Sequence, residues 1–134
     1  GAYYVAHVAR QRSGPGAVEA LVRQTAELDG QRVPIVMEQE PGSSGKLFTA
    51  ALIRTLGGWP IEAIPATGDK VTRAMPWLAQ AQAGNVKLVR GNWNTELLDE
   101  IAAFPQGAHD DQVDAISGAF AKLVRYRRGG GIHI

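Results

Sequence analysis

Short apolar runs alternate with helical patterns along this chain, and that alternation restricts its fold more than any other feature. Residues 33–37 form a nearly continuous apolar run, which is typical of a strand buried on both faces. Apolar residues at helical spacing begin at Pro15 and end near Asp29–Gly30. Other strand-like runs are expected at residues 2–10, 61–64 and 86–89. Strands and helices in this order predict an α/β domain with a largely parallel sheet.

Four more helices are predicted from apolar spacing and from stop signals. The spacing from Phe48 to Leu56 predicts a helix that Gly57–Gly58 ends. Asp69 can cap a helix over residues 70–83, which Pro76 would kink or divide. The last two are expected around residues 97–101 and over residues 110–125. We therefore expect one domain over residues 1–128 and a loose tail at 129–134.

The composition excludes several classes of function. Lys and Arg number 14 against 13 Asp and Glu, so DNA binding would depend on local patches rather than on a strongly basic field. The chain has no Cys, which excludes disulfides, thiolate zinc sites and Cys nucleophiles, so any metal ligands must be oxygen or imidazole groups. No apolar run approaches the roughly 20 residues of a membrane helix. We expect an intracellular protein without a membrane partner.

Two groups of acidic residues are candidates for metal binding. Glu38 and Glu40 follow the buried run at residues 33–37, and a strand end holds a side chain rigidly. The alternative is that the strand simply emerges into solvent there. Asp110, Asp111 and Asp114 open the last predicted helix, where the first and third lie about 40° apart and the second about 60° from the third.

A capping role and the helix dipole can explain Asp110 and Asp111, but they do not explain Asp114, which lies a turn further in. Clustered carboxylates near a core are costly unless a cation neutralises them. The cluster therefore predicts a divalent metal site, and more strongly so if Glu38 joins it. His109, beside the acids, could carry a proton or orient a ligand.

The segment Glu40–Leu47 resembles a phosphate-binding P-loop but departs from it at both ends. Glu40 stands where the first Gly should be, and Leu47 replaces the Ser or Thr that would hold magnesium. The sequence therefore disfavours nucleotide binding, and we expect Gly42 and Gly45 to serve turn geometry. Basic residues near the acids could instead contact DNA phosphates or form ordinary solvated faces; they are Lys46, Lys70, Arg73, Lys87 and Arg90.

Residues 36–46 and 109–115 together resemble the C-terminal nuclease domain of tailed-phage or prophage terminase large subunits. Shorter stretches at residues 68–74, 91–94 and 104–105 agree in the same order. The resemblance implies an RNase H-like fold, in which a mixed sheet is flanked by helices, and a divalent-metal-dependent endonuclease that cuts concatemeric phage DNA during packaging. It also implies two Mg²⁺ or Mn²⁺ ions about 4 Å apart.

By this resemblance Glu38, Asp111 and Asp114 bind the metal, with Asp110 as the alternative to Asp111. Glu40 and His109 would support them, and the phosphate contacts would be Lys46, Lys70 and Arg73. Implied partners are double-stranded DNA, an upstream ATPase domain, the small terminase subunit and the portal protein. The implied location is the cytoplasm of a bacterial host, with transient binding at the procapsid portal.

The family's first catalytic Asp lies on a strand upstream of the segment matched by residues 3–5. We therefore expect this chain to lack the first strand of the fold and to cleave poorly by itself. Another chain or the tail at residues 132–134 could fill that position. The alternative is a domain without catalysis that retains the fold and docks DNA or the portal protein.

Overall fold

The computed structural model describes residues 2–10, 14–65 and 68–128, with only the backbone course of Pro15 and of residues 126–128. The chain divides into two compact units. Unit 1 comprises Gly1–Ala9 and Gly68–Ile134, and unit 2 comprises Arg10–Thr67. The tail expected at residues 129–134 lies outside the described residues. No helix in the described part of the chain is long and apolar enough to cross a membrane.

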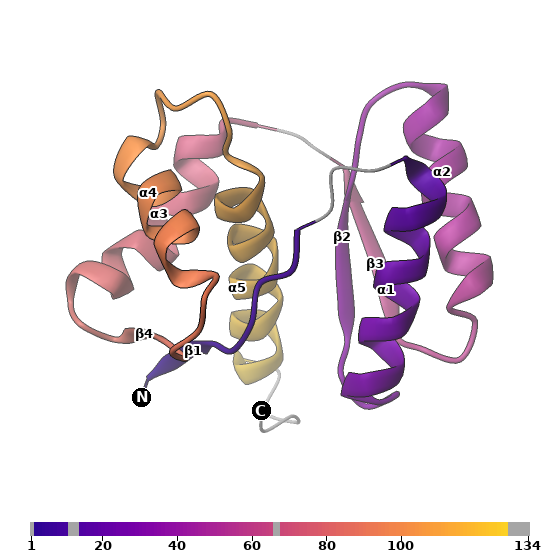
Figure 1. Cartoon of the computed structure of the whole chain (residues 1–134), viewed down its shortest axis with the longest axis horizontal. Helices are drawn as coiled ribbons and strands as arrows, with labels where there is room; N and C mark the ends of the chain where they lie inside the picture. The colour runs from indigo at the N-terminus through magenta and orange to yellow at the C-terminus, as the bar shows by residue number, and fades with distance from the viewer. Residues whose placement is uncertain (1, 11–13, 66–67, 129–134) are drawn as a thin grey trace. The chain divides into compact units, whose positions relative to one another are not determined.

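Unit 2 consists of a pair of parallel strands and two helices. Its strands are β2 (Ile35–Gln39) and β3 (Ile61–Pro65), and its helices are α1 (Pro15–Asp29) and α2 (Ser43–Thr55). The register places Glu38 opposite Ile64. α1 and α2 lie beside each other along this strand pair (Figure 1). The interior of the unit includes Ala26, Leu52 and Leu56, which are almost fully buried.

Unit 1 pairs the start of the chain with a strand from its second half. Here β1 (Tyr3–Val5) lies parallel to β4 (Val86–Leu88), and the helices are α3 (Lys70–Gln82), α4 (Asn94–Ala103) and α5 (Asp111–Arg128). α5 packs against both α3 and α4 (Figure 1). The core is formed by Ala74, Trp77 and Val113, and apolar side chains from all three helices cover it. Lys70 and Arg73 of α3 and the acids of α5 therefore lie on helices that share one core.

Both strand pairs are parallel, which confirms the α/β class and the predicted parallel direction of the strands, although the strands form two pairs and not one sheet. The helix predicted from Pro15 is observed with the same ends. Asp69 accepts a hydrogen bond from the Val71 amide at 3.0 Å, which confirms the predicted cap. The suggestion that Pro76 divides its helix was wrong, because α3 is one helix. Buried side chains on both sides of Pro76 hold that helix in place by tertiary packing.

The strand predictions needed larger corrections than the helix predictions. β2 begins and ends two residues later than predicted, so Glu38 belongs to the strand instead of following it. Hydrogen bonding to β3 extends as far as Pro65 and keeps this part of the chain extended. β1 covers only Tyr3–Val5 of the predicted residues 2–10, because its partner β4 is equally short. The last helix begins at Asp111, one residue later than predicted.

Candidate functional site

The predicted acidic cluster lies at the start of α5 in unit 1. Asp110 directly precedes the helix, and the amide of Asp114 donates to its backbone carbonyl at 2.9 Å, so the two residues are one helical turn apart. The Asp114 side chain is only 20% exposed and that of Asp110 is 25% exposed. Asp111 and His109 are exposed. The acids therefore lie at the rim of a packed helix, where a ligand can still reach them.

Two cations of α3 reach this cluster. The Lys70 ammonium donates a hydrogen bond to Oδ2 of Asp110, and Arg73 Nη2 lies 3.9 Å from Oδ1 of Asp114. The hydrogen bond that Lys70 donates to Asp110 is the main cause that raises the pKa of Lys70; desolvation lowers this pKa, and the charges of Asp110, Asp114 and Asp69 raise it further. Both residues were predicted as phosphate contacts. The structure brings them to the acids.

A buried carboxylate that the sequence reasoning missed holds the same turn of α5. Glu100 of α4 is only 7% exposed, and its Oε2 accepts a hydrogen bond from the Val113 amide at 2.7 Å. Val113 is the third residue of α5, so this is the amide that a capping Asp110 would have reached. The Asp110 side chain, for which a capping role was considered, accepts a hydrogen bond from Lys70. The sequence carried one signal for Glu100. This acid lies between Leu97 and Ile101, on the apolar face of a predicted helix.

A second buried polar contact joins α3 to α5 one turn further along. Trp77 Nε1 donates to the Ser117 hydroxyl at 2.9 Å, and that hydroxyl donates to the Val113 carbonyl at 2.9 Å. Trp77 is 2% exposed, so this indole N–H has its partner inside the protein. Through Ser117, these two hydrogen bonds join Trp77 of α3 to the backbone of α5.

Three of the candidate residues belong to unit 2; they are Glu38, Glu40 and Lys46. Glu38 is half-buried near the end of β2, while Glu40 and Lys46 are exposed beyond the strand and in the first turn of α2. The structure thus groups Lys70, Arg73, Asp110 and Asp114 within unit 1. The predicted meeting of Glu38 with Asp111 and Asp114 joins residues of different units and stays a prediction.

The P-loop-like segment has glycines with steric roles. Gly42 has a φ of 97°, a left-handed conformation that favours glycine. At Gly45 a Cβ atom would lie 2.8 Å from the carbonyl carbon of Glu40, which is too close. Gly45 therefore lets the first turn of α2 approach the end of β2. These roles agree with the expectation that the two glycines serve turn geometry.

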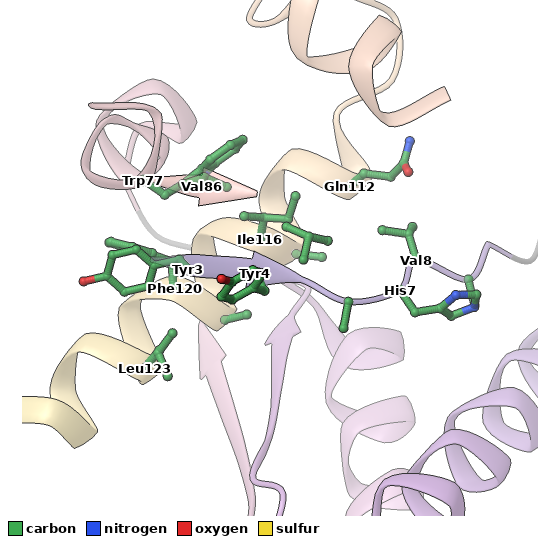
Figure 2. Close-up of a pocket in the computed structure, with 15 residues that line it drawn as sticks. Tyr3, Tyr4, His7, Val8, Trp77, Val86, Gln112, Ile116, Phe120 and Leu123 are labelled. Atoms are coloured by element: carbon green, nitrogen blue, oxygen red, sulfur yellow. The ribbon is translucent and has the colours of Figure 1, made fainter. Parts of the chain in front are cut away.

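A cavity of about 410 Å³ in unit 1 has the wrong chemistry for metal or phosphate. Its walls are the extended segment Tyr3–Ala9 and the apolar stripe of α5, including Ile116 and Phe120 (Figure 2). The rings of Tyr3 and Phe120 meet edge to face at 4.9 Å between centroids. Among its described lining residues are Gln112 and His7, but none of the α5 acids. We therefore place the candidate site at the acids and not in this cavity.

The possible metal donors of unit 1 are the carboxylates at the start of α5. Within the described residues, no three His, Asp or Glu side chains come close enough together to hold a metal ion. Unit 1 supplies Asp110, Asp111 and Asp114 within five consecutive positions at the start of α5. Carboxylate oxygens are the hard donors that Mg²⁺ and Mn²⁺ prefer. The donor type fits these ions, and a ligand from another element would be needed to complete the set.

Among known protein families, the model of the terminase RNaseH-like domain matches residues 1–123 of the chain. The chain belongs to this family. No curated protein and no solved structure matches it. The match to the terminase domain extends from β1 into α5 and includes all the candidate site residues. It confirms the RNase H-like fold and the resemblance to terminase nuclease domains.

Membership in the terminase family assigns this domain to nucleases of phage DNA packaging at the level of the family. DNA and the packaging complex are the partners that this family implies in general. The acids at the start of α5 are then the part of the terminase domain whose chemistry fits phosphodiester cleavage, since carboxylates are the usual ligands of the ions involved.

Proposed function

We propose that this terminase domain is a divalent-metal-dependent endonuclease that cuts concatemeric double-stranded phage DNA during genome packaging. Asp111 and Asp114 would hold Mg²⁺ or Mn²⁺ together with Glu38 from unit 2, with Asp110 as the alternative to Asp111. The observation that carries the proposal is the anchored first turn of α5. There Glu100 fixes the backbone beside the acids, and α3 supplies cations to two of them.

The ion pairs between α3 and the acids suggest a role for each charged residue of the terminase domain. Lys70 and Arg73 pair with Asp110 and Asp114 and offset the cost of their clustered negative charge. When bound, divalent ions activate water and neutralise charge that develops on phosphate oxygens. The acids would turn toward the ions, and the released cations of α3 would contact DNA phosphates. Lys46, exposed in the first turn of α2, would be a further phosphate contact.

His109 is exposed next to Asp110, where it can accept or donate a proton at the reacting phosphate. Glu40 is exposed beyond β2 and would support Glu38. In the packaging complex we propose contacts with the ATPase domain, the small terminase subunit and the portal protein. Packaging would place the domain in the cytoplasm of a bacterial host and transiently at the procapsid portal.

Nicking of supercoiled plasmid in Mn²⁺ tests the proposed nuclease. Asp114→Asn should lower the rate at least about 100-fold, because even residues that only support metal ligands cost 10–100-fold. Comparing Asp110→Asn with Asp111→Asn identifies which residue is the ligand. Asp99→Asn, which removes an exposed acid of α4, is the matched control and should cleave like the wild type. Undiminished cleavage by the Asp114 variant would exclude this site.

One observation favours a second candidate, a docking domain that binds DNA or the portal protein without cleaving. The ion pairs from α3 already neutralise two of the three acids, so the folded domain does not require a metal ion there. Wild-type protein that shifts DNA in a gel but neither cleaves nor binds Mn²⁺ would support docking. Manganese binding with cleavage would exclude it.

A further inference from the structure

Glu100 is a buried acid whose carboxyl group has little contact with solvent. It lies in the last turn of α4, 7% exposed, next in the chain to the half-buried Ile101. A carboxylate rarely occupies such a position unless hydrogen bonds satisfy both of its oxygens. Its two oxygens have partners on α5: Gln112 Nε2 donates to Oε1 at 3.0 Å, and the Val113 amide donates to Oε2 at 2.7 Å.

Both donors come from the first turn of α5, between Asp111 and Asp114 in sequence. The amides of a first helical turn have no acceptor within the helix, so this turn is the part most prone to fray. A charged acceptor forms a shorter and stronger hydrogen bond than a neutral one. Its negative charge also interacts favourably with the positive end of the helix dipole. Gln112 and Val113 are 5% and 0% exposed, which fixes the inward side of the turn. The flanking Asp111 and Asp114 are thereby held on the outward side of the same turn.

We infer that Glu100 is a positioning residue, whose two hydrogen bonds to α5 hold Asp111 and Asp114 in the arrangement that binds a divalent cation. This inference rests on the proposed function, because it concerns the geometry of that metal site. Glu100 itself does not touch the cation; it fixes the backbone from which the ligands project. Metal ligands need placement to within about 0.5 Å, and a fraying helix end does not supply it.

The test is a titration of the protein with Mn²⁺ by calorimetry, well below the melting temperature of each variant. Glu100→Ala should weaken the manganese Kd about 10- to 100-fold, the range seen when groups that orient metal ligands are removed. Asp99→Asn, the neighbouring exposed acid of the same helix, should leave the Kd unchanged. Amide hydrogen exchange at Val113 should accelerate in the Ala variant and not in the control.

Glu100→Gln separates positioning from charge. The new amide oxygen can still accept from the Val113 amide, and Gln112 can turn its own amide so that Oε1 accepts from the new NH₂ group. Gln112 Oε1 is buried and has no partner among the described residues, so this rotation costs no existing hydrogen bond. We expect a manganese Kd within about threefold of wild type, since the pair keeps its geometry. If Glu100→Ala does not fold, Glu100→Asp shortens the reach and keeps the charge, and it should weaken the Kd like the Ala variant.

The outcomes distinguish this inference from the proposed function. A folded Glu100→Ala protein with wild-type manganese affinity would overturn the positioning role and leave the metal site intact. A Gln variant as weak as the Ala variant would show that charge acts, and not hydrogen-bond geometry, which also overturns it. If the wild-type protein binds no manganese while the Val113 amide is still protected, the proposed metal site fails, and the positioning role fails with it.

Discussion

Lys70 is the first residue of α3, and its ammonium donates to a carboxylate that precedes α5. Its pKa is raised chiefly by this hydrogen bond to Asp110. A raised pKa in the folded state means that the charged form is favoured by folding. The resulting stability is fully present below the ordinary lysine pKa of about 10.4, and it is lost as the pH rises through the higher value of the folded protein.

The prediction is a difference in alkaline stability between wild type and Lys70→Met. In urea unfolding followed from neutral pH upward, the wild-type free energy of unfolding should fall more steeply above about pH 10.4 than that of the variant. Lys87→Met removes an exposed lysine of β4 and should retain the wild-type slope. Parallel curves for wild type and the Lys70 variant would contradict the raised pKa.

The sequence could identify the acids of α5, because their helical spacing is local. It could not pair Asp110 with Lys70, since that contact spans 40 positions and depends on how α3 packs against α5. The same limit applies to Glu100. Its place on an apolar helix face was visible, but its partner on α5 became known only with the packing of the two helices.

At the scale of elements, helices followed from the sequence more closely than strands. The ends of α1 were predicted correctly because proline, periodicity and glycine are local signals. The ends of β2 were misplaced by two residues, because a strand ends where its partner stops pairing, and β3 lies beyond a whole helix. The junction of β2 with α2 depends instead on a close contact within one short segment. There Gly45 approaches the backbone of Glu40 closely.

We predict that Gly45→Ala destabilises the protein by about 1–3 kcal/mol, the usual cost of adding a methyl group where no room exists. Gly16→Ala is a matched control, since Gly16 also lies in the first turn of a helix and nothing lies within 4 Å of its added Cβ. That change should be neutral or stabilise the protein by up to about 1 kcal/mol. Thermal melts of the two variants give the comparison. Equal stabilities would refute the steric role of Gly45.

At the scale of the whole molecule, the proposed metal site depends on residues from both units. Glu38 belongs to unit 2, whereas Asp111 and Asp114 belong to unit 1. A cation held by all three would bind only when both units are folded. Its binding free energy would then stabilise both of them, by about 2.7 kcal/mol at a free concentration of 100 times the Kd.

Hydrogen exchange with and without manganese tests this coupling. We expect slower amide exchange in β2 and in the first turns of α5 when Mn²⁺ is added. Glu38→Gln should abolish the added protection in β2, whereas Glu27→Gln, an exposed acid of the same unit, should not. Protection confined to α5 would show that Glu38 does not share the ion.

The discontinuous make-up of unit 1 has a consequence for biosynthesis. Tyr3 leaves the ribosome before unit 2 does, but its strand partner Val86 follows only after all of Arg10–Thr67 has been translated. Unit 2 is continuous in sequence and can fold while residues 68–128 are still being made. Residues Tyr3–Val5 therefore stay unpaired until β4 has been synthesised. The speed of translation over residues 10–88 sets how long their side chains remain accessible to chaperones.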